Sequence, residues 1–166
     1  MKEKTCCFIG HRKIQNEEKL KAFLRTFIRS LVENGFTRFI FGSKSDFDNI
    51  CLEIATELKE EYPEIYRIGY LTKAYSGSKR LYEEVCKPDF IYTSGKAVYV
   101  ERNQYIIDQS DYCIFYYDKN YIPPIKIISK KRYVIPITTS GKSGTEIAYK
   151  YALKKKKQTL NIFYLI

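Results

Sequence analysis

Short apolar runs alternate with helical patterns along most of the chain. Residues 5–9 form an apolar run that suits a buried strand. Apolar side chains then recur at helical spacing from Leu20 to Val32, with Asn16 expected at the N-cap and Gly35 as the stop signal. The opening of the chain therefore predicts a strand followed by an amphipathic helix.

The same alternation continues to the end of the sequence. Further strands are predicted at 37–41, 66–71, 111–117 and 159–166, and further helices at 47–58, 97–110 and 143–157. Strands that alternate with helices favour a parallel sheet that is covered on both faces. We therefore expect a Rossmann-like three-layer α/β/α sandwich with a mostly parallel central sheet, folded as one domain over residues 1–166.

Two segments do not fit this alternation. Within residues 72–94 only the stretch RLYEEVC is mildly helical. Residues 119–137 instead carry two alternating β-like stretches on either side of Ser129–Lys131. The second segment predicts a β-hairpin inserted into the α/β domain.

Charge and composition narrow the class of partner. The chain has 166 residues, of which 45% are apolar, so it can fill a hydrophobic core. Twenty-nine Lys and Arg against nineteen Asp and Glu give a net charge of +10. This charge favours anionic partners such as nucleotides, nucleic acid or acidic lipid, without choosing among them.

The five cysteines do not suggest a metal or redox site. They are scattered and lack CxxC spacing, and four of them lie in apolar segments, where a reduced cysteine packs as a small hydrophobe. No leader peptide opens the sequence, and no apolar run reaches the length of about 18 residues that a membrane span needs. We expect a cytoplasmic protein with no membrane partner, no metal and no cofactor.

Three polar turns follow predicted strands. In parallel sheets of this kind ligands bind beyond the carboxyl ends of the strands, so these turns are the candidate site. The turns comprise Gly10, His11 and Arg12; Gly42 and Ser43 with Asp48; and Gly141, Ser143, Gly144 and Thr145. The third turn opens a helix directly, so its amides and the helix dipole would suit a phosphate.

Each turn also has an explanation without a ligand. A glycine with solvated polar neighbours is common between a strand and a helix, and Asp46 and Asp48 would serve as helix caps. The third turn is not a Walker A loop: Gly141, Lys142 and Ser143 match its ending, but Pro136 stands where the earlier glycine is needed. The turns alone therefore leave a ligand site and ordinary connections both open.

Four stretches together resemble the SLOG superfamily, and within it the YpsA-like branch. They are CCFIGHR, FGSKSDFD, the segment VERNQYIIDQSDYCIFYYD and SGTEIAYKYA. The superfamily includes the Lonely Guy phosphoribohydrolases and nucleotide-sensing domains of bacterial defence and signalling proteins. The resemblance implies that Gly10, His11, Arg12, Gly42, Ser43, Asp48, Arg102, Asn103, Gly141, Ser143, Gly144 and Thr145 form the ligand site.

The sequence departs from the Lonely Guy enzymes at the catalytic position. Those enzymes carry a PGGxGTxxE loop whose glutamate assists cleavage of the N-glycosidic bond. Here Ala148 stands three residues after Thr145, and the neighbouring acid, Glu146, points about 200° away from that direction on a helix. The resemblance therefore favours binding over hydrolysis, with no catalytic residue assigned.

We expect a receptor or sequestering protein for a nucleotide-derived signal. An N-glycosidase of the Lonely Guy type and a nucleic-acid-binding protein remain the alternatives. The aromatic residues expected to stack on a base are Tyr99, Tyr116, Tyr117 and Tyr121. Because relatives often build the site near a dimer interface, a homo-oligomer is also expected.

Overall fold

The computed structural model describes residues 3–73, 75, 77, 79, 81–93, 95–122, 126–130, 133–137 and 142–166, with only the backbone described for 126–130 and 133–137. Its main body is a six-stranded sheet in the order β4-β3-β2-β1-β5-β8, in which every neighbouring pair is parallel. The strands are β1 (Lys4–Gly10), β2 (Phe36–Phe41), β3 (Tyr66–Tyr70), β4 (Glu84–Cys86), β5 (Tyr112–Tyr116) and β8 (Gln158–Asn161). The Rossmann-like fold predicted from the alternation is thereby confirmed.

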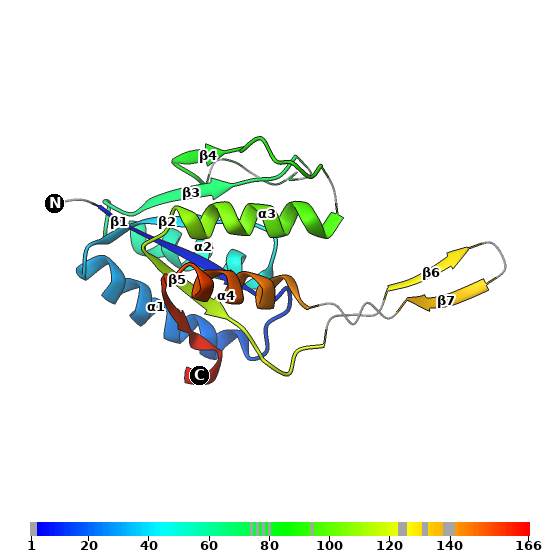
Figure 1. Ribbon diagram of the computed structural model, residues 1–166. Helices are drawn as coiled ribbons and strands as arrows, with labels where there is room; N and C mark the ends of the chain where they lie inside the picture. The colour runs from blue at the N-terminus through cyan, green and yellow to red at the C-terminus, as the bar shows by residue number, and fades with distance from the viewer. Residues whose placement is uncertain are drawn as a thin grey trace.

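Helices cover both faces of the sheet. They are α1 (Glu17–Glu33), α2 (Asp46–Lys59), α3 (Gly95–Asp108) and α4 (Gly144–Lys154). Helices α1 and α2 pack together on one face and α3 and α4 on the other (Figure 1). Successive side chains of β1 point to opposite faces of the sheet. Cys6 and Phe8 pack in the core beside α1 and α2, and Cys7 and Ile9 pack in the core beside α3 and α4.

The predicted insert is a β-hairpin. Strands β6 (Lys126–Lys130) and β7 (Tyr133–Ile137) pair antiparallel with each other. Figure 1 shows this hairpin standing apart from the main body.

Two predictions near the ends of the sheet were wrong in detail. The described part of the RLYEEVC segment, residues 81–86, is not helical: it contains the three-residue edge strand β4, which pairs with β3. The last strand stops at Asn161 and continues as a 3₁₀ helix, η1 (Ile162–Leu165). The Asn161 side chain accepts hydrogen bonds from the backbone N–H groups of Tyr117 and Phe163 and donates one to the carbonyl of Tyr117. These side-chain bonds take the place of backbone bonds between β5 and β8, and the chain turns into η1 here.

The N-terminal boundary of α1 also differs from the expected cap. Asn16 adopts a left-handed backbone conformation and makes no side-chain capping bond. Helix α1 ends before Gly35, as predicted. Gly35 has a φ of 89°, and its backbone N–H donates to the Val32 carbonyl. Within the described residues, no helix combines the length and apolar character needed to cross a membrane.

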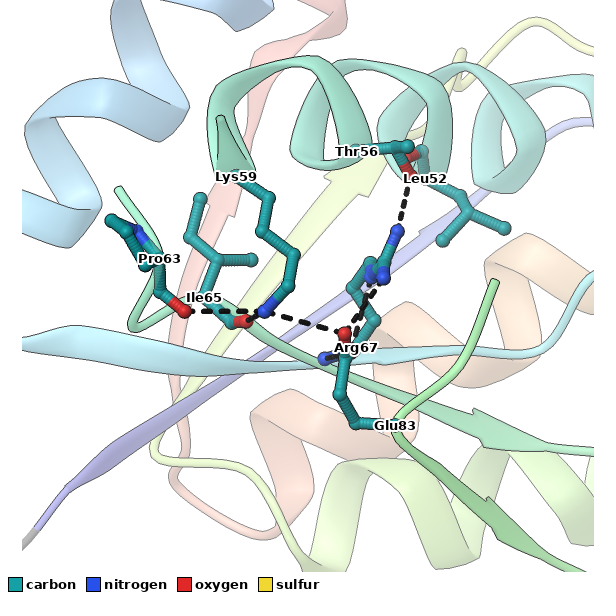
Figure 2. A network of polar contacts seen from close by, with 7 residues as sticks. All are labelled: Leu52, Thr56, Lys59, Pro63, Ile65, Arg67 and Glu83. Carbon is teal, nitrogen blue, oxygen red and sulfur yellow. Dashed lines mark hydrogen bonds and ion pairs between the residues drawn. The ribbon is translucent and has the colours of Figure 1, made fainter. Parts of the chain in front are cut away.

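A partly exposed ion network joins β3, α2 and the segment before β4 (Figure 2). The Arg67 guanidinium donates to both carboxylate oxygens of Glu83, at 3.0 and 2.6 Å, and to Thr56 Oγ1 at 3.0 Å. Lys59 on α2 also lies 3.3 Å from Glu83. Burial raises the pKa of Glu83, but the bonds from Arg67 outweigh it and bring the pKa to about 2. The network holds Glu83, and with it the adjoining Tyr82, against the sheet.

Candidate functional site

The carboxyl ends of the six strands share one edge of the sheet because all of them are parallel. The chain first builds outward from β1 to β4 and then crosses to β5 and β8 on the other side of β1. This change of direction is where ligands bind in open α/β sheets. The predicted polar turns follow β1 and β2 at this edge, and the third predicted turn precedes α4.

The turn after β1 uses its glycine for packing. A Cβ built on Gly10 would lie 2.5 Å from the Phe47 ring. Phe47 is fully buried in α2, so its ring fills the space that a side chain at position 10 would need. Close packing of α2 on β1 therefore explains this glycine.

His11 joins the ends of β1 and β5. Its Nε2 accepts the backbone N–H of Asp118 at 2.9 Å, and its ring stacks on Tyr121 with centroids 4.1 Å apart. Burial lowers the pKa of His11, although the charge of Asp118 opposes this change. The imidazole is therefore neutral at neutral pH, and its Nε2 is already engaged.

Arg12 contributes its backbone to the same junction. Its carbonyl accepts the amide of Asp46, the first residue of α2, at 3.0 Å. The Arg12 side chain itself is exposed. The turn thus connects β1, α2 and β5 and leaves one exposed cation beside the strand ends.

The turn after β2 is shaped by a residue of α3. Arg102 is only 4% exposed, and its Nη1 donates to the carbonyl of Gly42 at 3.0 Å. Its Nη2 donates to Asn103 Oδ1 at 3.2 Å. A Cβ on Gly42 would lie 2.7 Å from Arg102 Cζ. The guanidinium therefore occupies the space that a side chain at position 42 would need.

Four side chains near this turn have a buried polar atom without a hydrogen-bond partner. We call them the buried polar cluster: Ser43 Oγ, Asp48 Oδ1, Tyr82 Oη and Arg102 Nε. Buried polar atoms nearly always find partners, and exceptions call for a specific explanation. Ser43 is also held at a φ of 55°, a conformation that side-chain-bearing residues seldom adopt. The cluster therefore has the features of a binding site.

The charges of the cluster act on one another. Burial raises the pKa of Asp48 to about 6, and the positive charge of Arg102 limits the rise. Burial lowers the pKa of Arg102, opposed by the charge of Asp48. Burial also raises the pKa of Tyr82, to which the charges of Tyr75 and Asp48 add. These couplings place Asp48, Tyr82 and Arg102 in one electrostatic environment.

Tyr99 lies at the edge of this cluster. The Lys44 ammonium and the Arg102 guanidinium lie 4.9 and 5.0 Å from the centre of its ring. Burial acts to raise the pKa of Tyr99, but the bonds to Lys44 and Thr72 and the nearby positive charges lower it overall. The cations that contact this ring add positive charge beside the cluster.

The other three tyrosines proposed to stack on a base are already in ring contacts. Tyr116 is buried and stacks on Phe47 at 5.5 Å, and Tyr117 is buried with its hydroxyl on Glu146. Tyr121 is partly exposed and stacks on His11. Base stacking stays a prediction for all four tyrosines, and Tyr116 and Tyr117 have the least exposed surface to offer.

The third turn begins α4. Ser143 caps the helix by accepting the amide of Glu146 at 3.1 Å, and Thr145 is buried. Among the described residues, no atom lies within 4 Å of a Cβ built on Gly144. Gly141 lies outside the described residues. The described part of the turn is a regular helix start with an accessible first residue.

The position of the enzymes' glutamate is occupied by core packing. Ala148 is 2% exposed and belongs to the apolar cluster between α3, α4 and the sheet. Glu146 instead forms an ion pair with Lys150 at 3.3 Å and accepts the Tyr117 hydroxyl at 3.4 Å. Neither residue offers a free carboxylate at the position that the enzymes use.

Two residues of interest carried no recognisable signal in the sequence. Tyr82 comes from the segment read as mildly helical, and Glu101 looks like one more polar residue of α3. The Glu101 carboxylate accepts the amides of Ile91 and Tyr92 at 2.9 and 3.1 Å and so fixes the segment before α3. Both roles depend on contacts that sequence spacing does not reveal.

A large hollow of the surface lies away from the buried polar cluster. An open groove of about 800 Å³ runs along α3 and α4 and is bordered by Ile91, Tyr92 and Tyr105. We place the candidate site at the cluster because four of the buried unpaired polar atoms gather there, whereas Arg29 Nε and Thr37 Oγ1 are not part of it. Across the described residues, no group of three or more His, Cys, Asp or Glu side chains is arranged to hold a metal ion.

A parallel six-stranded sheet with helices on both faces defines a Rossmann-like α/β protein. The YpsA family model, described as the YspA SLOG family, matches residues 7–133, and the chain belongs to this family. A UPF0398 protein of Streptococcus pyogenes serotype M6 is 28% identical over 144 residues, which cover 83% of this chain and 72% of the relative. The resemblance noted in the sequence is confirmed, and membership suggests a nucleotide-related role.

The matched segment includes two of the three predicted turns. Gly10 to Arg12, Gly42 to Asp48 and the Arg102–Asn103 pair all fall inside it, whereas Gly144 and its neighbours fall outside. The structure brings Gly42, Arg102 and Asn103 into direct contact and couples Asp48 to them. It does not show a described contact between these residues and Gly144.

Proposed function

We propose that this protein binds a nucleotide or a nucleotide-derived small molecule beside the carboxyl ends of β2 and β3, as a receptor or a sequestering protein. The observation that carries the proposal is the buried polar cluster, whose unpaired donors and acceptors belong to side chains from three separate segments. Membership of the SLOG family and the net charge of +10 support an anionic, nucleotide-like ligand. Arg102 would supply buried positive charge, and the open start of α4 a place for phosphate.

The test is a direct binding measurement with a fixed panel. Isothermal titration with AMP, GMP, CMP, UMP and ADP-ribose would identify a ligand, and thermal unfolding would show its stabilisation. Arg102→Ala removes a charge-assisted donor, so affinity should fall by about ten- to a hundredfold. No binding to any member of the panel, or equal binding by the wild type and this variant, would contradict the proposal.

Arg25→Ala is the matched control. Arg25 lies on the outer surface of α1, where it pairs with Glu57 at 3.1 Å and is 43% exposed. The substitution removes the same charge as Arg102→Ala but leaves the cluster intact. If both variants weaken binding to the same extent, only the net charge matters and the site assignment fails.

One observation favours hydrolysis as the second candidate. A buried carboxyl with a pKa of about 6, as Asp48 has, is suited to general acid catalysis near neutral pH. Incubation with AMP and other nucleotides, followed by chromatography of the free base, separates the two functions. The binding proposal expects no release above background, whereas release over many turnovers that Asp48→Asn abolishes would establish the hydrolase.

Nucleic acid is the remaining alternative because of the positive charge. A nonspecific electrostatic interaction would be weak, independent of sequence and steeply dependent on salt. Fluorescence anisotropy with labelled oligonucleotides over a salt series would measure this. Tight binding that persists at about 0.2 M salt would favour the nucleic-acid function over the small-molecule one.

A further inference from the structure

Asp48 and Arg102 have opposite charges in one buried environment, but they do not bond to each other. Each retains an unpaired atom, Oδ1 of Asp48 and Nε of Arg102, and both side chains are at least nine-tenths buried. The other nitrogens of the guanidinium already donate to the Gly42 carbonyl and to Asn103 Oδ1. Nε is thus the one guanidinium nitrogen of Arg102 that has no hydrogen-bond partner.

The unpaired atoms specify the chemistry of a matching group. An ionised carboxylate only accepts hydrogen bonds, and a guanidinium N–H only donates them. An alcohol hydroxyl can do both, because it donates one hydrogen bond and accepts others, so neighbouring hydroxyls can satisfy the two atoms. The hydroxyls of Ser43 and Tyr82 can do either, so they adapt to a second hydroxyl nearby.

A phosphate fits this environment less well. Its oxygens act as acceptors at neutral pH, so they would leave Asp48 Oδ1 unpaired. The negative charge of a phosphate would also repel Asp48, and burial weakens the screening of that repulsion. Arg102 would then gain one bond at the cost of a buried pair of like charges.

We propose that the buried polar cluster binds the vicinal hydroxyls of a ribose, with Asp48 as acceptor and Arg102 Nε as donor. This inference rests on the proposed nucleotide binding and assigns the sugar, not the phosphate, to Arg102. The protein then selects ribonucleotides over deoxyribonucleotides. The phosphate of the same ligand is left to the exposed cations and the start of α4.

The experiment compares ribose with deoxyribose on one nucleotide. Whichever of AMP, GMP, CMP, UMP and ADP-ribose binds most tightly is titrated beside its 2′-deoxy and 3′-deoxy analogues. A site built to bond a hydroxyl should bind at least one analogue about tenfold more weakly or worse. In Asp48→Asn, the ribose form should lose affinity, and the ratio between ribose and deoxyribose forms should shrink below about threefold.

Two further variants distinguish a loss of binding from a loss of folding. Tyr82→Phe removes one unpaired hydroxyl without changing the shape of the ring, and it should weaken the ribose form more than the analogues. Asp46→Asn changes an exposed carboxylate in the first turn of the same helix and should leave the ratio as in the wild type. Circular dichroism confirms that each variant is folded before titration.

The outcomes separate the two proposals. If no ribonucleotide of the panel binds, the proposed function fails, and the ribose inference fails with it. If ribose and deoxyribose forms bind equally to the wild type, nucleotide binding stands and the ribose inference is overturned. An unchanged ratio in Asp48→Asn, with normal binding, also overturns the assignment of Asp48.

Discussion

The turns after β1 and β2 look alike in sequence, and both bury polar side chains beside a glycine. After β1, Gly10 makes room for Phe47, and His11 Nε2 accepts the Asp118 amide. After β2, Gly42 makes room for Arg102, and Ser43 and Arg102 both keep unpaired atoms. His11 of the first turn is bonded within the protein, whereas the second turn lies beside buried polar atoms without a partner. A strand followed by glycine and polar residues therefore does not by itself identify a binding site.

The difference has an energetic basis. Polar groups that are buried and bonded within the protein add modestly to stability, whereas buried groups without partners cost free energy. Such a cost is commonly found at functional sites, where it is offset by the rest of the fold. Removing a bonded polar group of the first turn should therefore lower the stability, whereas removing an unpaired polar group beside the second turn should raise it.

The largest effect is expected from Gly10→Val. The new side chain would clash with the Phe47 ring, and overpacking of this kind costs about 3 kcal/mol of unfolding free energy. Gly144→Val is the control: no atom of the described residues lies within 4 Å of its Cβ position, so the unfolding free energy should stay within about 0.5 kcal/mol. Chemical denaturation measures both. A stable Gly10→Val variant would show that this glycine is not needed for packing.

Asp48→Asn should stabilise the protein above about pH 6. The folded pKa of Asp48 is raised from 3.8 to about 6, so the unfolded chain ionises first as the pH rises. Wild-type stability therefore falls between those values, and the full cost, about 2–3 kcal/mol, is present above them. The variant lacks this fall. Denaturation midpoints at several pH values give the answer, and parallel pH curves would contradict the raised pKa.

Glu83→Gln should act in the opposite direction, because this carboxylate is fully bonded. The folded pKa of about 2 lies below the ordinary value of 4.5, so its contribution is present above the ordinary value and is lost as the pH falls towards about 2. The variant should lose about 2 kcal/mol at neutral pH, after allowance for partial exposure. Wild type and variant should converge in acid. A constant difference at every pH would mean that Glu83 acts through packing instead of charge.

His11→Leu tests whether the first turn acts only in the fold. The change leaves the partly buried amide of Asp118 without its acceptor, which costs about 1–2 kcal/mol. Nucleotide affinity should change by less than about threefold, because the engaged nitrogen is not available to a ligand. Thermal unfolding and titration measure the two effects separately. A loss of about tenfold or more in affinity would show that His11 contributes to ligand binding.

The smallest effect on stability is expected from Gly42→Ala. The added methyl group would displace the Arg102 guanidinium, at a cost of about 1 kcal/mol. The same displacement should lower nucleotide affinity by about tenfold, since it moves Nε from its position. Ala55→Gly on α2 is a useful contrast, because it is expected to cost at least as much stability while leaving affinity unchanged. Equal affinities for all three proteins would remove Gly42 from the site.

The local pattern of the sequence was enough to predict the main architecture. Apolar runs such as residues 5–9, and helical spacing such as that from Leu20 to Val32, indicate which face of each element is buried. This pattern lies within each segment and needs no knowledge of its neighbours. The same local signals marked the turn after β2 and the insert that forms β6 and β7. The identity of the family likewise followed from short motifs within the chain.

Tertiary structure alone decided which polar residues meet. Gly42 and Arg102 are 60 residues apart, and Tyr82 reaches the cluster from a segment with no periodic pattern. The strand β4 has three residues, and its position depends on pairing with β3 beside the Arg67–Glu83 bonds, so no local preference indicates it. Hydrogen-bond satisfaction is a property of contacts across the fold. For that reason the sequence predicted polar turns, and only the folded chain separated the bonded turn from the one with unpaired atoms.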